Sequence, residues 1–281
     1  EVMLAAVCDK SLSVLNDANW YWTSATYGPR LNLIRTFVNT YLMEDGTPFT
    51  DMEGYKTMVF MDEVKNRDKR LQQTIRMGDY KRIDGGVQTP APPIFSYTYT
   101  GYQPIKYCLD DVFYDSGANN DNSIPLIRFA EVLLNYAEAV NEYYGPDHED
   151  VLGEYTISPL AVLKLLRERA GIDAGKDGRY GLAEDIDKDY VKMRDAIRLE
   201  RRIELAFEGH RFFDVRRWMI AETTQNQQMY GYKITRSTNG IEKGEKVPVR
   251  KHTFREAMYF FPIPYKETVK SEDLLQNPYY E

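Results

Sequence analysis

The sequence predicts a mainly α-helical fold: tetratricopeptide-like helix pairs (an α-α superhelix) joined to a large loop-rich region that carries short strands. Two observations support the helical part: apolar residues recur with helical spacing over 124–144 and 160–171, and a charged amphipathic pattern covers about 190–209. A third supports the loop-rich part, because residues 1–120 show only short apolar runs between Gly- and Pro-bearing stretches. We therefore expect one domain spanning 1–281, with a variable region at 1–120 and a helical region at 121–281.

The bulk composition is that of an ordinary globular chain. Of the 281 residues, 43% are hydrophobic and 28% are charged, which is enough to bury a sizeable core. The net charge of −7 argues against a dedicated binder of nucleic acid or anionic membrane. No apolar run reaches 18 residues, so no membrane span is expected. The chain opens in the middle of a pattern without an initiator Met, and we interpret it as a fragment.

Short elements and turns are expected in the first 120 residues. The runs 1–7 (EVMLAAV) and 36–43 (TFVNTYLM) could each be strand or helix. Asp45-Gly46 marks a turn, and 89–95 is a Pro-rich extended stretch. Residues 96–107 (SYTYTGYQPIKY) alternate Tyr with small polar residues, which favours an exposed strand or hairpin.

The first run contains a cysteine, and its interpretation affects localisation. LAAVC at 4–8 superficially resembles a lipidation signal, but no charged and hydrophobic leader precedes it, and Val7 is not the small residue expected before a lipidated Cys. A strand entering a core is the better account. Cys8 and Cys108 make no disulfide framework and no CxxC motif, and whether they pair is open.

Two helices are expected to form an antiparallel pair after residue 120. Residues 121–123 supply a helix cap and Pro125 fits the first turn of the helix that follows. That helix is polar along one narrow stripe only, so it should be covered on most sides. A second helix begins at Ser158-Pro159 and ends at Gly171. Such a pair is one unit of a tetratricopeptide-like solenoid and needs neighbours to bury its faces.

A third helix is expected over about 190–209, with Gly209 as its end. Stepping 100° per residue gathers one apolar face, formed by Met193, Ala196, Ile203 and Phe207. The opposite face holds arginines that we expect to be solvated, namely Arg194, Arg198, Arg201 and Arg202. Glu200 falls in the middle of the apolar face and Glu204 at its edge, and a buried carboxylate needs a counter-charge.

A new helix is expected directly after Gly209, and it brings the nearest cations to those carboxylates. We predict that Glu200 or Glu204 pairs across the Gly209 turn with one of three arginines, which are Arg211, Arg216 and Arg217. The arginines and rings of 211–218 could also form a nucleic-acid surface, but the interleaved carboxylates would repel phosphate, so an ion-paired helix junction is preferred.

Neither a cofactor nor a metal is expected. The three histidines are scattered without neighbouring ligands at metal spacing, and the sequence has no GxGxxG, P-loop or GxSxG motif. The loop 115–123 (DSGANNDNS) is rich in oxygen ligands, but Leu126 stands where a calcium loop carries its acidic twelfth residue. A turn with a helix cap is therefore preferred over a calcium site.

The loop 16–30 (NDANWYWTSATYGPR) is the best candidate for ligand binding. Aromatic rings stack on the C–H faces of sugars, which would be the role of Trp20, Trp22 and Tyr27. Nearby polar groups, Asn19 and Arg30, can bind the hydroxyls. The alternative is that one or more of these rings anchor the loop on the core.

A family resemblance rests on four motifs that occur in order from residue 124. They are IPLIRFAEVLLNYAEAVNE, LLRERAGI, ERRIELAFEGHRFFDVRRW, and FFPIPYKE with LLQNPYY at the C-terminus. With YLMEDGTPF at 41–49 and RDKRLQQTI at 67–75, they make the chain resemble the C-terminal half of the SusD/RagB family of outer-membrane nutrient-binding lipoproteins. The family's lipidated Cys and N-terminal helix pairs have no counterpart in this sequence.

The resemblance implies a function without catalysis. It implies a protein held at the cell surface by a lipid anchor on the outer membrane, with a SusC-like TonB-dependent transporter as partner and an oligosaccharide as ligand. Some members of the family serve peptides or other nutrients instead, and a glycoside hydrolase or a purely protein-binding solenoid are further alternatives. Ligand contacts vary across the family, so no site residue is transferred by motif.

Overall fold

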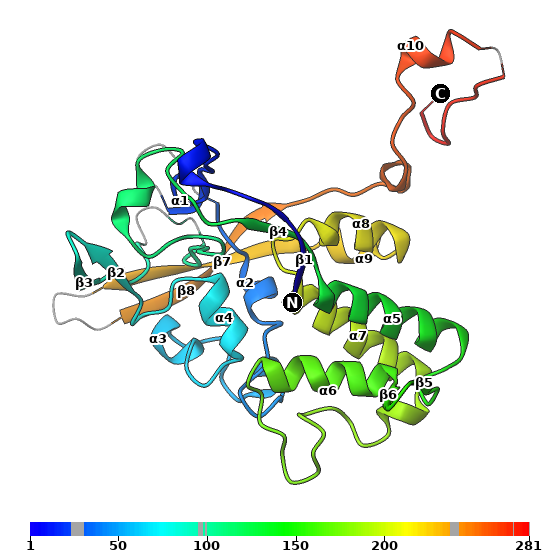
Figure 1. The fold of residues 1–281 in the computed structure, drawn as a ribbon, viewed down its shortest axis with the longest axis horizontal. Coiled ribbons are helices and arrows are strands. Elements are labelled where there is room, and N and C mark those ends of the chain that lie inside the picture. Colours follow the sequence, from blue (N-terminus) through cyan, green and yellow to red (C-terminus); the bar gives the residue numbers. More distant parts are fainter. Residues whose placement is uncertain (24–30, 95–97, 99, 237–241, 272, 281) are drawn as a thin grey trace.

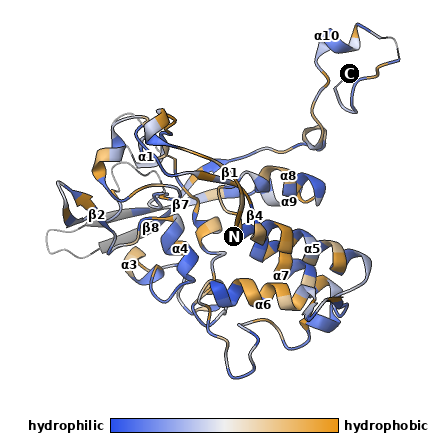
Figure 2. Ribbon diagram, viewed as in Figure 1, coloured by the Kyte–Doolittle hydropathy of each residue, from blue (hydrophilic) through white to orange (hydrophobic). Residues whose placement is uncertain are grey.

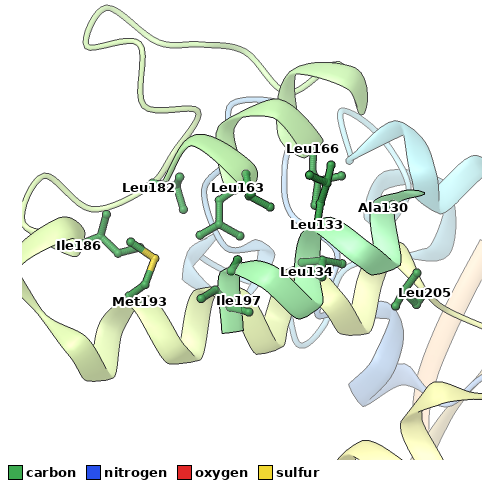
Figure 3. Close-up of a cluster of buried hydrophobic side chains, with 12 residues drawn as sticks. Ala130, Leu133, Leu134, Leu163, Leu166, Leu182, Ile186, Met193, Ile197 and Leu205 are labelled. Atoms are coloured by element: carbon green, nitrogen blue, oxygen red, sulfur yellow. The ribbon is translucent and has the colours of Figure 1, made fainter. Parts of the chain in front are cut away.

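The computed structural model describes residues 1–281 except 24–30, 95–97, 99, 237–241, 272 and 281 (Figure 1). Three helices form its helical part: α5 (Phe129–Tyr143), α6 (Pro159–Arg169) and α7 (Tyr190–Glu204). Their facing sides bury one apolar cluster, in which Leu134, Leu163, Met193 and Ile197 are almost fully inaccessible (Figure 3). Figure 2 shows the apolar stripes of these helices, with polar residues on their outer faces. The mainly helical expectation is confirmed, and α5 with α6 forms the predicted antiparallel pair.

The predicted start and end of α6 are confirmed, whereas α7 ends at Glu204 rather than at the predicted Gly209, which directly precedes α8 (His210–Arg217). The Ser158 hydroxyl accepts a hydrogen bond from the backbone N–H of Ala161 at the start of α6, with Pro159 in the first turn. Gly171, at φ +76°, leads the chain away from the end of α6. The Asp189 carboxylate caps α7 by accepting from two backbone N–H groups. A small hairpin, β5 (Asp150–Leu152) with β6 (Tyr155–Ile157), lies between α5 and α6.

The helix predicted from residue 124 begins later. Residues Ile124–Arg128 form strand β4, which pairs antiparallel with β1 (Val2–Ala6), and α5 starts only at Phe129. The reason is long-range: the backbone of β4 bonds to a strand more than 100 residues away, an option that periodicity cannot reveal. β1 is a strand as expected of LAAVC, but it does not enter a core, because its side chains are largely exposed.

The loop-rich region is built from short elements. Its helices are α1 (Ala18–Thr23), α2 (Arg35–Val38), α3 (Phe60–Glu63), α4 (Lys69–Thr74) and the 3-10 turns η1 (Lys10–Leu12), η2 (Phe49–Asp51) and η3 (Val112–Asp115), and its hairpin is β2 (Lys81–Asp84) with β3 (Val87–Pro90). A second apolar cluster holds them together, with Tyr41, Phe60, Leu71 and Tyr102 at its centre. Ile203 of α7 belongs to this cluster, so the two regions share a core.

One expectation for this region is wrong. Thr98 and residues 100–105 are buried, whereas an exposed strand or hairpin was predicted for 96–107. Tyr102 explains the difference, because its ring is fully inaccessible and its hydroxyl donates to the Glu63 carboxylate. Alternating Tyr residues therefore indicate amphipathic rings, but not which side of them faces water.

The C-terminal part continues with α8 (His210–Arg217), α9 (Ala221–Gln225) and a long hairpin, β7 (Gln228–Arg236) with β8 (Glu242–Lys251). Strand β7 runs beside α2. The remaining elements are η4 (Ile186–Lys188), η5 (Glu256–Tyr259) and α10 (Tyr265–Thr268). Figure 1 shows the segment that carries α10 extending away from the body. Within the described residues, no helix combines the length and apolarity that crossing a bilayer requires.

Candidate binding site at the α7–α8 corner

A buried ion network fixes α7 in the molecule. Glu200 is fully inaccessible and pairs with Arg70 (Oε1–Nη1 2.5 Å) and Arg167 (Oε2–Nε 3.0 Å). Glu204 pairs with Arg70 at 3.0 Å, Arg128 at 2.8 Å and Arg169 at 2.5 Å. Burial alone would raise the pKa of Glu204, but these guanidiniums lower it to about 2.

The prediction that Glu200 and Glu204 are buried and paired is confirmed, but the predicted partners are wrong. Arg211, Arg216 and Arg217 contact neither carboxylate; the counter-charges come from α4, β4 and α6. The physical reason is the direction of the apolar face of α7, which points into the body of the molecule. Helix α8 packs on another side of α7.

An ion pair does cross the Gly209 turn, with the charges reversed. Arg201 of α7, which was expected to be solvated, is 5% exposed and bonds to Asp214 of α8 (Nε–Oδ2 2.8 Å). Arg217 pairs with the same Asp214 and with Glu138 of α5. Arg216 lies over the Phe212 ring, 3.5 Å from its centroid. An ion pair therefore joins the two helices across the turn, but it is formed by Arg201 and Asp214 and not by the predicted residues.

The same corner forms the wall of a cavity of about 530 Å³. It lies between the end of α7, the start of α8, α2 and the first residues of β7. Its apolar walls are formed by Leu33, Ile34, Phe37, Leu205, Ala206, Phe207, Phe212 and Met229. Its charged walls are Arg201, Arg202, Arg211 and Asp214, with His210 beside them. A cavity of this size with apolar walls and a few polar groups is typical of a small-molecule site.

Phe207 connects this cavity to the aromatic stretch singled out in the sequence. Its backbone has φ +64°, a left-handed conformation that is costly for an aromatic residue and concentrates at functional sites. The ring of Trp22 packs against it edge to face, with centroids 4.8 Å apart. Helix α1 therefore contacts one residue of the cavity wall, and the two stretches that are separate in the sequence meet at Phe207.

The predicted ligand-contacting residues occupy different environments. Trp20 and Trp22 are half-buried on α1, and Tyr21 between them is 43% exposed. Tyr27 and Arg30 lie outside the described residues. Phe113 on η3, beside α1, is 58% exposed and was not singled out in the sequence. The only sequence feature that marks Phe113 is its aromatic neighbour Tyr114, and such a pair does not distinguish an exposed ring from a buried one.

Asn19 was expected to bind hydroxyls, and the structure contradicts this. The residue is fully inaccessible, and its amide oxygen accepts from Leu109 N–H and Asn120 Nδ2. Its amide nitrogen donates to the Leu109 carbonyl and to Asp115 Oδ1. Every bonding position therefore faces protein, because α1 must be tied to the loop that follows residue 108. Asn19 holds α1 in place and offers nothing to a ligand.

The oxygen-rich loop 115–123 uses its side chains in the same way. Asp115 pairs with Arg82 (Oδ2–Nη1 2.5 Å) and accepts from Thr23, and Asn120 bonds to Asn19. Desolvation would raise the pKa of Asp115, but Arg82 and its other donors lower it. Among the described residues, no group of three or more His, Cys, Asp or Glu side chains is placed to hold a metal ion.

Both cysteines are free thiols in the described structure. Burial raises the pKa of the Cys108 thiol to about 12. A thiol in that state is a poor nucleophile and metal ligand at neutral pH.

These features together define a helix-pair scaffold with a cavity between its helical and loop-rich regions, which is the candidate binding site. Comparison with known proteins identifies the family. Residues 8–280 match the family model described as SusD family, and the chain belongs to that family.

The relatives agree with this assignment. The chain is 30% identical to SusD-like protein P2 of Formosa agariphila over 159 residues. This matched segment is 57% of this chain and 26% of that protein. A crystal structure of a SusD-like protein from Bacteroides fragilis superposes with a TM-score of 0.71 at 23% identity, covering 100% of this chain and 54% of that one. The crystal structure of a SusD-like carbohydrate binding protein from the same species superposes with a TM-score of 0.60 at 26% identity. The match covers 91% of this chain and 51% of that one. The chain thus spans about half the length of these solved structures.

Proposed function

We propose that this chain binds an oligosaccharide at the α7–α8 corner. We propose further that it delivers this ligand to a SusC-like TonB-dependent transporter of the outer membrane. The observation that carries the binding role is the contact between Trp22 and Phe207, which places α1 at the edge of an apolar-walled cavity. Family membership and the carbohydrate-binding relative support the saccharide as ligand and the cell surface, through a lipid anchor, as location.

The walls of the cavity suit a sugar ring. Pyranose rings present flat C–H faces that pack on aromatic rings, while their hydroxyls need donors and acceptors at the rim. Phe37, Phe207 and Phe212 provide the flat apolar surface, and Asn32 and Gln225 provide amides. Tyr21 is exposed and packs edge to face on Trp22, which contacts Phe207 of the cavity wall, and we expect Tyr21 and the half-buried Trp20 of the same helix to extend the aromatic surface.

A binding role is favoured over hydrolysis by the state of the carboxylate in the cavity wall. Glycoside hydrolysis needs two carboxyl groups free to act on the bond. Asp214 is the carboxylate among the described lining residues, and Arg201 and Arg217 hold its two oxygens. A carboxylate neutralised in this way supplies neither a general acid nor a nucleophile.

The test is calorimetric titration of the purified protein with a panel of oligosaccharides. Trp20→Ala and Tyr21→Ala should each weaken binding about 5- to 30-fold, because each removes a stacking face worth about 1–2 kcal/mol. Tyr155→Ala is the matched control, since Tyr155 on β6 is 78% exposed but lies at the opposite side of the molecule from α1 (Figure 1). Failure of every saccharide to bind, or tight binding of peptides alone, would overturn the proposal.

Delivery needs a separate measurement. Co-purification from detergent-solubilised outer membranes should recover the chain with a TonB-dependent transporter. Recovery of the chain without any transporter, under conditions that preserve other outer-membrane complexes, would refute the delivery role and leave saccharide binding intact.

A further inference from the structure

Two arginines in the wall of the α7–α8 cavity, Arg202 and Arg211, differ from the arginines of the buried ion network. Arg70, Arg128, Arg167 and Arg201 each pair with a carboxylate. Arg202 and Arg211 have neither an ion pair nor a hydrogen bond to their guanidiniums within the described chain.

The contacts that these two arginines do make are with rings. Arg202 lies over Phe37 at 5.4 Å from the ring centroid, and Arg211 lies over Trp218 at 6.0 Å. Both are half-buried, so water satisfies them only in part. A guanidinium has five N–H donors, and ring faces cannot take their place in the plane of the group.

The positive charge of Arg211 also acts on Arg202. Burial, and then the positive charge of Arg211, lower the pKa of Arg202 to about 10. Burial also lowers the pKa of Arg211. Asp214 is the one acidic residue among the described lining residues, and Arg201 and Arg217 already pair with it, so the described cavity wall has an excess of positive charge. Like charges held together in a partly desolvated wall reduce stability unless an anion is bound between them.

We propose that the α7–α8 cavity binds an anionic saccharide, one that carries a carboxylate or sulfate group, and that Arg202 and Arg211 bind that group. The guanidinium fork matches the geometry of carboxylate and sulfate oxygens, so each of these two groups offers an oxyanion a fork of donors from the cavity wall. The apolar wall of Phe37 and Phe207 would then contact the C–H face of the same sugar ring.

This inference rests on the proposed function, since it names the class of saccharide for the same site. It also explains why the chain, at a net charge of −7, places unpaired cations in one cavity. The overall negative field would repel an acidic ligand from most of the surface, and a local positive cavity supplies the attraction that binding requires.

The experiment titrates the purified protein with three trisaccharides of similar size: a trigalacturonate, a sulfated galactose trisaccharide and a neutral galactose trisaccharide. At least one anionic ligand should bind about tenfold tighter than the neutral one, with an advantage that shrinks as salt is added. The two anionic arms decide between carboxylate and sulfate.

Three variants test the assignment. Arg202→Gln and Arg211→Gln should each weaken binding of the anionic ligand about tenfold and leave the neutral ligand unchanged. Lys176→Gln removes the same charge from the exposed loop after α6 and should change neither. The melting temperature of Arg202→Gln should stay the same or rise, because an unpaired, partly desolvated charge is removed. A role confined to the fold predicts the opposite, a lower melting temperature.

The outcomes separate the two proposals. An anionic ligand that binds no tighter than the neutral one, or a preference that survives both substitutions, would overturn the anionic site while saccharide binding stands. Absence of binding by all three sugars and by the wider panel would overturn the proposed function as well. Arg202-dependent binding of an acidic peptide, with no sugar bound, would overturn the saccharide assignment.

Discussion

The buried Glu200 carboxylate offers the sharpest test of how the helical and loop-rich regions are held together. Its two oxygens bond to Arg70 and Arg167, and all three side chains are at least nine-tenths buried. The substitution Glu200→Gln keeps the shape of the side chain and removes its charge. Arg70 retains Asp68 and Glu204 as counter-charges. Arg167 retains only a hydrogen bond to the Tyr180 carbonyl.

The expected loss of stability follows from the buried charge that remains on Arg167. Removing one partner of a buried pair costs about 3–5 kcal/mol, because the other charge stays buried and uncompensated. The unfolding entropy of a globular protein is about 2.1 cal/mol/K per residue, which for 281 residues is roughly 0.6 kcal/mol/K. The melting temperature should therefore fall by roughly 5–9 °C.

The assay is thermal unfolding followed by circular dichroism, with urea unfolding as a second measure of stability. The double variant Glu200→Gln/Arg167→Met should recover most of the loss, because it removes the uncompensated charge together with its partner. Asp62→Asn is the matched control, since it breaks an exposed pair with Lys65 and should cost about 0–1 kcal/mol. A loss below about 1 kcal/mol for Glu200→Gln, or a double variant less stable than the single, would refute the reasoning.

Two further predictions concern the turn at Gly46 and the acid stability of the network. Gly46→Ala should destabilise by at least 2 kcal/mol, because a Cβ there would lie 2.4 Å from the Tyr180 carbonyl oxygen and φ is +81°. Gly54→Ala has a similar φ of +76° with no atom within 4 Å, so it should cost only about 1 kcal/mol; equal losses would contradict the steric account. The pKa of Glu204, lowered from 4.5 to about 2, implies a stabilisation of about 3 kcal/mol that is complete above about pH 5.5 and is lost as the pH falls toward 2. Urea unfolding at pH 6 and pH 3 should show this loss, and Glu204→Gln should reduce it; an unchanged pH dependence in the variant would argue against Glu204 as its source.

The partners of Glu200 show how far sequence patterns reach. A carboxylate on the apolar face of a helix was recognisable from periodicity alone, and so was its need for a cation. Helical periodicity over 159–170 also places Arg167 beside Leu163 and Leu166 on the buried stripe of α6, so Arg167 was recognisable as a buried cation. The predicted partners were instead the arginines after Gly209, because they are nearest to Glu200 and Glu204 in the sequence. Pairing across more than 30 residues depends on how helices pack, and short-range spacing carries no information about it.

The residues of the candidate site also include some that the sequence could identify and some that it could not. Trp20 and Trp22 could be recognised because aromatic residues clustered in a polar stretch are unusual, and Trp22 contacts Phe207 of the cavity wall, while a role for Trp20 stays a prediction. Asn19 in the same stretch looked equally suitable, but its amide is consumed by contacts with Leu109, Asp115 and Asn120. Composition shows that a polar group is present; only its surroundings show whether it is available.

The sequence by itself determined the helical class, the caps of α6, the family and the presence of buried carboxylates on α7, because each is encoded in local spacing or in an ordered set of motifs. The tertiary structure alone decided where α5 begins, which arginines neutralise Glu200 and Glu204, and that Trp22 meets Phe207 beside two unpaired guanidiniums. The physical reason is one of range. Caps and periodicity arise from neighbours within a turn of helix, whereas strand pairing, ion pairing and cavity walls join residues brought together only when the core packs.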